Sequence, residues 1–317
     1  MQSVKKQFRV KFPAQTFLLP YLLVLSGATS LLAIDSSGTL AGGTIGWYQC
    51  SAPVQLDNTA DYSWWYGCSP TAAGMMMGYY DRNGYLGQDY GNLVPGGVAE
   101  ANTFGNPGAL VNSTIASSGH ITDFYPGGYR AQGDDNPQPW HSFNCLADFM
   151  GTSQDALGNP NGTTTFYYWT DGQPFTAQDA FNMGVWNQDG MYGIGEYLNY
   201  AGYGYTTLYT QLIDTAASLG FTYNQYMAEI DAGRPVMIEL DGHTMLGYGY
   251  DAAGNLVYVY DTWTQGPHTM TWGGTYGGMS QWGVEVLEIA SVPEPNTFLL
   301  LVAAGLIGRV YICRRVK

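Results

Sequence analysis

The segment that follows Cys68 constrains the fold more than any other part of the sequence. Apolar or aromatic residues stand at positions 72, 75, 76 and 79, which is the spacing of one buried helix face. Pro70 suits the first turn of such a helix, where a missing N–H costs no hydrogen bond. We therefore expect Cys68 at a helix N-terminus, where unpaired N–H groups and the helix dipole favour a thiolate. A buried structural cysteine before a core helix is the alternative.

A second region, residues 233–263, has the pattern of strands joined by tight turns. Residues 233–240 and 256–261 are rich in apolar β-formers, and residues 251–255 are a turn by composition. A turn centred near residue 252 or 253 pairs residues whose numbers sum to about 505, and His243 and Asp261 sum to 504. This register predicts a histidine opposite a carboxylate on the neighbouring strand, with an ordinary surface pair as the alternative.

These two regions resemble the papain-like cysteine peptidases. The first reads YGCSPTAA at residues 66–73, and the second runs from GRPV at 233–236 through His243 to Asp261 and an aromatic residue. They are most similar to the branch related to the bacteriocin-leader-processing peptidase domain, the peptidase C39-like group. The resemblance covers roughly residues 50–290. It implies an α+β fold, in which a helix bearing Cys68 packs on an antiparallel sheet bearing His243 and Asp261.

The resemblance also implies a role for each of these residues. Cys68 would attack the acyl carbon of a peptide or protein substrate, and His243 would take the thiol proton and later protonate the leaving amine. Asp261 would hold the imidazole and stabilise its charged form. The backbone N–H of Cys68 would supply one oxyanion donor. This chemistry requires no cofactor and no metal.

The chain departs from the family at the second oxyanion donor. The family has a glutamine about six residues before the cysteine, but Tyr62 stands there, and the nearest upstream glutamine is Gln55. Both are oxyanion candidates, and loss of such a donor typically costs about a hundredfold or more in rate. Ser69 also replaces the usual glycine. A catalytically weak or inactive papain-fold surface protein that binds peptides or exopolysaccharide is therefore the alternative function, and acyl transfer by the same three residues is a third.

The cysteines are few for an exported chain: Cys50, Cys68, Cys145 and Cys313. Cys313 lies in the C-terminal tail, so one disulfide and one free thiol are expected among the other three. A Cys50–Cys145 pair would leave Cys68 free for chemistry, although the sequence does not fix the pairing.

Residues 85–210 form a long, loop-rich insert between the two blocks, with short helical stretches at 142–150 and 178–183. The segments that begin at His120 and His141 suggest zinc ligands. Neither repeats a ligand pair in a recognised zinc pattern, and Cys145 has a competing use as half of a disulfide, so we expect no metal site.

Residues 1–33 have the pattern of a secretory signal peptide. A basic stretch precedes an apolar run at 17–25, and the small-x-small sequence at 28–30 suits a signal peptidase, with Ala33 as a second site. An uncleaved anchor helix is the alternative. The peptidase domain is then expected over residues 34–290, outside the cytoplasm.

Residues 291–317 resemble the PEP-CTERM sorting signal. Pro293, Glu294 and Pro295 form the tripeptide, residues 297–308 are almost entirely apolar, and the end is basic. The apolar segment predicts a short membrane helix with its basic end in the cytoplasm, although Arg309 interrupts it. The resemblance implies an exosortase-type enzyme as a partner and a destination at the cell surface or outside it, with transient anchoring in the membrane.

The charge of the chain argues against a nucleic-acid partner. The net charge is −14, and only Arg82, Arg130 and Arg234 carry positive charge between the two basic ends. Nucleic-acid binding relies on Lys and Arg against phosphate, so this class of function is not expected. Acidic loops could hold calcium, but no segment matches the twelve-residue helix-loop-helix calcium pattern.

Overall fold

The computed structural model describes residues 38–40, 43–45, 52–125 and 141–290 of the 317-residue chain. The predicted signal peptide, Cys50, Cys313 and the predicted membrane helix of the tail lie outside the described residues. Among the described residues, no helix is both long and apolar enough to span a bilayer.

The chain divides into two units, residues 1–49 and residues 50–317. In the first unit, β1 (Gly38–Leu40) and β2 (Gly43–Ile45) pair as an antiparallel hairpin, with Gly38 opposite Ile45. The second unit holds every other described element and all the residues predicted to carry chemistry.

The second unit is built on one antiparallel sheet, in the order β4-β5-β11-β6-β7-β8-β9, with β3 paired to β7 and β10 paired to β11. The strands are β3 (Val54–Gln55), β4 (Phe175–Thr176), β5 (Tyr205–Leu212), β6 (Val236–Leu240), β7 (His243–Asp251), β8 (Leu256–Tyr260), β9 (His268–Thr271), β10 (Thr275–Tyr276) and β11 (Met279–Ile289). Strands far apart in sequence are neighbours here, since β5 and β6 both pair with β11.

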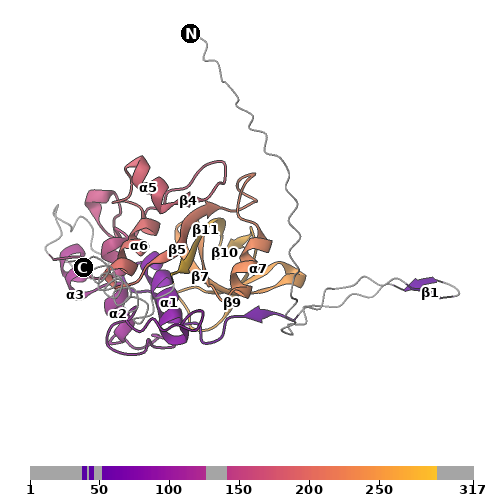
Figure 1. Cartoon of the computed structure of the whole chain (residues 1–317), viewed down its shortest axis with the longest axis horizontal. Coiled ribbons are helices and arrows are strands. Elements are labelled where there is room, and N and C mark those ends of the chain that lie inside the picture. The colour runs from indigo at the N-terminus through magenta and orange to yellow at the C-terminus, as the bar shows by residue number, and fades with distance from the viewer. Residues whose placement is uncertain (1–37, 41–42, 46–51, 126–140, 291–317) are drawn as a thin grey trace, which may run out of the picture. The chain divides into compact units, whose positions relative to one another are not determined.

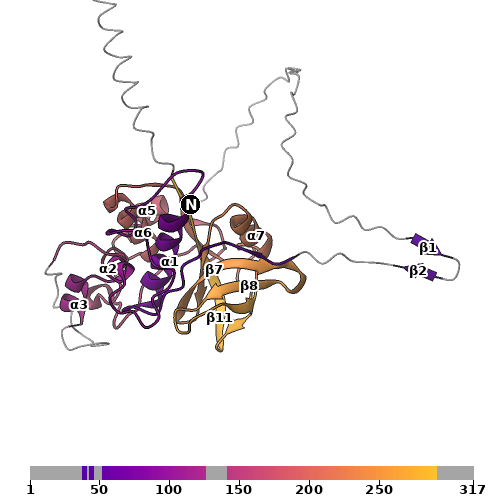
Figure 2. The same ribbon diagram turned by 90° about the horizontal axis from the view of Figure 1, so that it is seen from below.

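Helices cover both faces of this sheet (Figures 1 and 2). The helices are α1 (Cys68–Asn83), α2 (Leu110–Ile115), α3 (Ser118–Phe124), α4 (Leu146–Phe149), α5 (Ala177–Met183), α6 (Gly190–Tyr200) and α7 (Tyr223–Asp231). Helix α1 packs on β6 and β7 from one face, and α7 packs on the same two strands from the other.

Alternation along the central strands explains the two layers, because successive side chains of a strand point to opposite faces. Met237 and Leu246 belong to the hydrophobic core around α1, whereas Ile238 and Met245 belong to the core around α7. Residues 69–81 of α1 are all buried, so this helix is central to its layer. The predicted α+β fold of papain-like type, with the Cys68 helix packed on an antiparallel sheet, is confirmed.

The predicted hairpin forms at residues 243–260 with a register close to the expected one. Leu246 pairs with Tyr260 and Gly247 with Val259, and a bulge follows between Gly247 and Gly249. Strand β8 ends at Tyr260, so Asp261 lies just beyond the ladder. At its N-terminal end, β7 follows β6 after a two-residue turn, which places Leu240 opposite His243. Gly242 in this turn has a φ of +83°, a conformation that suits glycine.

The region from residue 85 to 210 contains the predicted helical stretches as α4 and α5. It is more than a surface insert, because β4 and β5 in its C-terminal half join the main sheet and α6 packs on β5. Its middle part, residues 161–166, forms one wall of the cleft described next.

Candidate active site

Cys68 is the first residue of α1, as the sequence predicted. Pro70 has no N–H, and the N–H of Thr71 donates to the carbonyl of Gly67 at 3.2 Å. The helix therefore leaves the N–H groups of Cys68 and Ser69 without intrahelical acceptors. The thiol side chain is partly exposed and faces a cleft of about 380 Å³.

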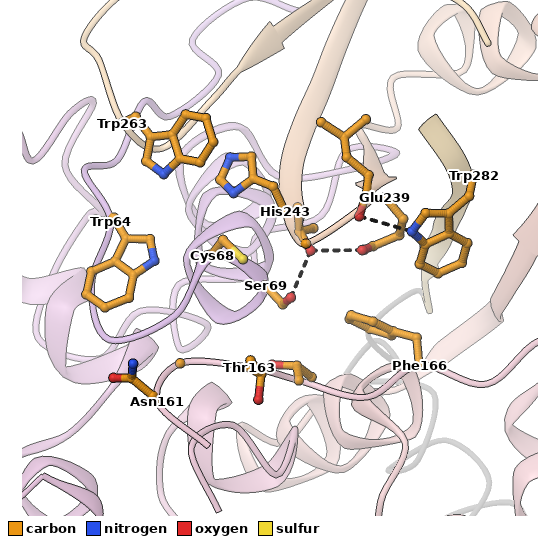
Figure 3. A pocket seen from close by; sticks show the side chains of 15 residues that line it. Trp64, Cys68, Ser69, Asn161, Thr163, Phe166, Glu239, His243, Trp263 and Trp282 are labelled. Carbon is orange, nitrogen blue, oxygen red and sulfur yellow. Dashed lines mark hydrogen bonds between the residues drawn. The ribbon is translucent and has the colours of Figure 1, made fainter. Parts of the chain in front are cut away.

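His243 opens β7 and lines the same cleft as Cys68 (Figure 3). Its Nε2 lies 2.9 Å from the main-chain carbonyl oxygen of Asp261. A carbonyl only accepts hydrogen bonds, so Nε2 carries the proton and Nδ1 keeps a lone pair. The ring stacks on Trp263, with 3.8 Å between centroids and 19° between planes. The side chain is 4% exposed, so both contacts fix its orientation.

The carboxylate of Asp261 does not make the contact that the hairpin register predicted. Its Oδ1 accepts the N–H groups of Trp263 and Thr264, both at 2.9 Å. Its Oδ2 accepts the hydroxyls of Tyr276 at 2.6 Å and Thr264 at 3.1 Å. Because Asp261 lies beyond the end of β8, its side chain caps the following turn, and its main chain reaches His243 instead.

Two hydrogen bonds join the halves of the site across the sequence. The hydroxyls of Ser69 and Thr244 are 2.8 Å apart, which ties the start of α1 to β7. The N–H of Trp64 donates to the carbonyl of Thr262 at 2.7 Å, which ties the loop before Cys68 to the turn after Asp261. The relative position of Cys68 and His243 therefore depends on long-range contacts as well as on local structure.

Burial has the largest effect on the pKa values of both Cys68 and His243. It raises the pKa of the Cys68 thiol, and the nearby Glu239 raises it further, although N–H groups of Thr244 and Ser69 oppose the change. Burial also lowers the pKa of His243, against the smaller opposing effect of Asp261. Both shifts favour a neutral thiol beside a neutral imidazole in the free protein. The helix N-terminus, expected to favour a thiolate, is outweighed by burial.

Glu239 is a cleft residue that the sequence analysis missed. Its Oε2 accepts the Thr244 hydroxyl at 2.8 Å, so a chain of hydrogen bonds runs from Ser69 through Thr244 to this carboxyl group. Burial raises the pKa of Glu239 to about 8. A sequence signal was present, because Glu239 is the one charged residue in the otherwise apolar strand β6.

Two further buried carboxyl groups extend this set, because Glu285 interacts with Glu239 and Asp189 interacts with Glu285. Burial raises the pKa of Glu285 well above its ordinary value, and repulsion from Glu239 and Asp189 adds to the shift. Burial raises the pKa of Asp189 to about 7. Both oxygens of Glu285 and Oε1 of Glu239 have no hydrogen-bond partner among the described residues.

Neither oxyanion candidate lines the cleft. Gln55 is exposed on β3, where it pairs with Gly249 at the far end of β7 from His243. Tyr62 is fully buried, and its hydroxyl donates to the carbonyl of Glu100 at 2.8 Å. The backbone donors at the thiol are the N–H groups at the start of α1 and the N–H of Thr244.

Cys145 carries a free thiol that is fully buried at the start of α4. Cys50 lies outside the described residues, so the Cys50–Cys145 disulfide finds no support here and stays a prediction. Cys145 lies beside His120 and Asp148 in a second Cys-His-Asp group, none of whose members lines the cleft. All three side chains of this group are 0% exposed, which keeps a substrate carbonyl away from the thiol.

Comparison with known families supports both resemblances. Residues 141–276 match the model of the peptidase C39-like family, and residues 291–315 match the PEP-CTERM protein-sorting motif. The first match spans less than half of the chain; it includes His243 and Asp261 and begins after Cys68. No curated protein and no solved structure gives a significant match. The predicted likeness to C39-like cysteine peptidases, in a chain with a PEP-CTERM motif, is confirmed.

Proposed function

From the likeness to the C39-like peptidases, we propose that this protein is an exported cysteine peptidase acting at the cell surface or in the extracellular matrix. Cys68 is its nucleophile and His243 its general base. The observation that carries the proposal is that Cys68 and His243, 175 positions apart in sequence, line one cleft, with Nδ1 of the histidine left as the basic nitrogen.

The proposed reaction starts from a neutral Cys68 thiol and a neutral His243 imidazole. As the Cys68 sulfur attacks the peptide carbonyl carbon, its proton passes to Nδ1 of His243. The imidazolium then carries a proton on each nitrogen, and the Asp261 carbonyl and the nearby Asp261 charge stabilise it. Nδ1 returns the proton to the leaving amine, which departs and leaves a thioester on Cys68. Water, deprotonated by Nδ1, hydrolyses the thioester and regenerates the thiol.

The oxyanion of each tetrahedral intermediate would accept the N–H of Cys68, with Ser69 N–H as a second donor in place of the missing glutamine. Pro70 has no N–H, so the third backbone donor that a helix start ordinarily offers is missing, and the N–H groups of Cys68 and Ser69 are the two that remain. Donors fixed by a helix need no reorganisation as charge develops on the oxygen.

The test is hydrolysis of a library of unstructured peptides by the purified chain, followed by mass spectrometry. Cys68→Ala and His243→Ala should each lower the rate by about a thousandfold or more. Gln178→Ala, on the exposed side of α5, is the matched control and should keep full activity. Equal rates in Cys68→Ala and the unaltered chain would overturn the proposal.

Binding without catalysis is a second candidate, favoured by the neutral Cys68–His243 pair and by the tryptophans in the cleft. Trp64, Trp263 and Trp282 all line it, and aromatic side chains present apolar faces to peptides or sugars. Under this alternative, Cys68→Ala binds the same ligand as the unaltered chain and no product forms. An added amine acceptor in the peptide assay separates transfer from hydrolysis, because transfer yields the amide of that acceptor.

Export and sorting are supported by the PEP-CTERM motif, which implies processing by an exosortase-type enzyme. We propose that the tail anchors the chain in the membrane until it is processed. Fractionation of the producing cells should recover the chain outside the cytoplasm, shortened near residues 293–295. Recovery of the intact chain in the cytoplasm would contradict this route.

A further inference from the structure

A compact group of potential metal ligands lies outside the cleft, where α3 meets α4. His120 comes from α3, His141 and Cys145 precede α4, and Asp148 lies within it. One ligand atom each of His120, Cys145 and Asp148 lies within 4.8 Å of the others. Nε2 of His141 is 3.1 Å from both oxygens of Asp148, so it belongs to the same group. We propose that these four side chains bind one Zn²⁺ ion as a structural site.

Each donor in the group is of a type that binds zinc: two imidazole nitrogens, a thiolate and a carboxylate oxygen. Four such ligands at zinc-bond lengths stand about 3.3–3.8 Å apart in a tetrahedron. Nδ1 of His120 and Oδ1 of Asp148 are 2.8 Å apart, closer than in a filled site, while the ligand atoms of His120, Cys145 and Asp148 together lie within 4.8 Å of one another. Movements of about one ångström or less would bring the ligands to the spacing of a filled site.

Charge also favours an ion at this place. His141 lies between two carboxylates, with Nδ1 2.5 Å from Asp123 and Nε2 3.1 Å from Asp148, so negative charge faces both ring nitrogens. A thiolate, one carboxylate and two neutral imidazoles carry two negative charges, which a bound Zn²⁺ would neutralise. The contact with Asp123 is then the carboxylate–histidine–metal arrangement that orients a ligating imidazole.

Local structure is shaped to hold the His141 ring. A Cβ atom at Gly119 would come within 2.7 Å of this ring, so only glycine lets the ring lie against α3. Helices of seven and four residues are too short to be stable alone, and an ion that joins them would hold both in place.

The site would stiffen the surroundings of the cleft. Next to α3, the hydroxyl of Tyr125 donates to the carbonyl of Tyr66, two residues before Cys68, at 2.9 Å. Within α4, the carbonyl of Asp148 accepts from the side chain of Gln154 at 2.8 Å, and Gln154 leads into the wall at residues 161–166. The ion would therefore support the active site without contacting substrate.

The test is metal content of the full chain, purified without a histidine tag and dialysed against buffered Zn²⁺. We expect about one Zn²⁺ per chain, lost in Cys145→Ala and His141→Gln. Asp123→Asn should retain the ligands but weaken binding by about 10- to 100-fold. Cys68→Ala and His268→Gln remove a thiol and an imidazole elsewhere, and both should keep the ion.

A second measurement keeps the proposal testable if a variant fails to fold. In the unaltered chain, Co²⁺ should replace Zn²⁺ and give the strong absorption of a tetrahedral site with a thiolate ligand, and added Zn²⁺ should raise the Tm of the chelator-treated protein. Failure of the unaltered chain to bind either ion would overturn the proposal. His141 would then be a charged bridge between Asp123 and Asp148. Neither result depends on peptidase activity.

Discussion

Asp261 holds His243 through its main-chain carbonyl, 2.9 Å from Nε2, while its carboxylate turns away to cap residues 263 and 264. One residue thus has two separate tasks. Its backbone fixes the tautomer of the histidine, and its side chain fixes the turn that carries the stacking Trp263. The carboxylate is held charged despite its burial, because hydrogen bonds from Tyr276 and the turn N–H groups lower the pKa of Asp261.

Asp261→Asn should therefore be mild. An asparagine side chain still accepts the two turn N–H groups, and the carbonyl that contacts His243 is unchanged. We expect kcat/KM to fall about tenfold or less, from the lost charge near the imidazolium, against the roughly 10⁴-fold loss in triads where the carboxylate itself holds the histidine. Peptide hydrolysis by the variant, beside His243→Ala, measures this. A loss as large as that of His243→Ala would assign the orienting role to the carboxylate.

The ionisation of Cys68 should respond in opposite directions to its two neighbours. In the free protein, the rate of labelling by iodoacetamide should rise only above the ordinary thiol pKa of about 8.5, because burial raises the pKa of Cys68. Glu239→Gln removes a nearby negative charge and should move the profile to lower pH. Ser69→Ala removes a hydrogen bond to the thiolate and should move it to higher pH.

Mass mapping of the labelled peptide separates Cys68 from Cys145, which is fully buried. Fast labelling near pH 6 that disappears in His243→Ala would reveal a preformed thiolate–imidazolium pair, and the neutral ground state would be wrong.

The sequence was informative where local patterns decide the structure. Apolar spacing and Pro70 placed Cys68 at the start of α1, and turn composition gave the β7–β8 hairpin within a residue or two of register. The hydrogen-bond partner of His243 could not be predicted from the sequence, because it depends on where β8 ends, and that strand ends one residue before Asp261. Counting residues along an uninterrupted hairpin assigned the contact with His243 to the side chain of Asp261.

Long-range packing accounts for the other differences. Tyr62 stands at the family's glutamine position, but it enters the core, where its hydroxyl meets Glu100 and its ring lies against Gly78. His120 and Asp148 are 28 residues apart with no recognised ligand spacing, so only the packing of α3 on α4 reveals that they touch. The position of Glu239 in an apolar strand is a sequence signal for a buried charged residue. Its hydrogen-bonded link to Ser69 through Thr244 depends on the packing of α1 against β7 and could not be predicted.

The free energy of unfolding should fall as the pH rises toward 8. Burial raises the pKa of Asp189 to about 7 and that of Glu239 to about 8, both above their unfolded values, so the native state favours the protonated forms. Their stabilising contribution is complete below about pH 4 and is lost as the pH passes through 7 to 8. Urea denaturation at pH 5 and pH 8.5 should differ by on the order of 1 kcal/mol or more, since one pKa unit corresponds to about 1.4 kcal/mol.

Glu285→Gln should flatten this dependence, because it removes a buried acid whose oxygens have no hydrogen-bond partner among the described residues. Glu288→Gln, a third exposed on the same strand β11, is the matched control and should keep the slope of the unaltered chain. Identical slopes in all three proteins would mean that the buried acids are not the source of the effect.

Trp263 should matter for catalysis more than for stability. It is 48% exposed, yet its ring covers the imidazole of His243 at 3.8 Å and so restricts the histidine to the orientation in which Nδ1 is the basic nitrogen. Trp263→Ala should lower kcat by about tenfold or more, because a misplaced catalytic base loses the advantage of fixed orientation, while Tm changes little. Trp263→Phe keeps an aromatic face and should recover most of the rate. If Trp263→Ala raises KM and leaves kcat unchanged, the ring binds substrate and does not position His243.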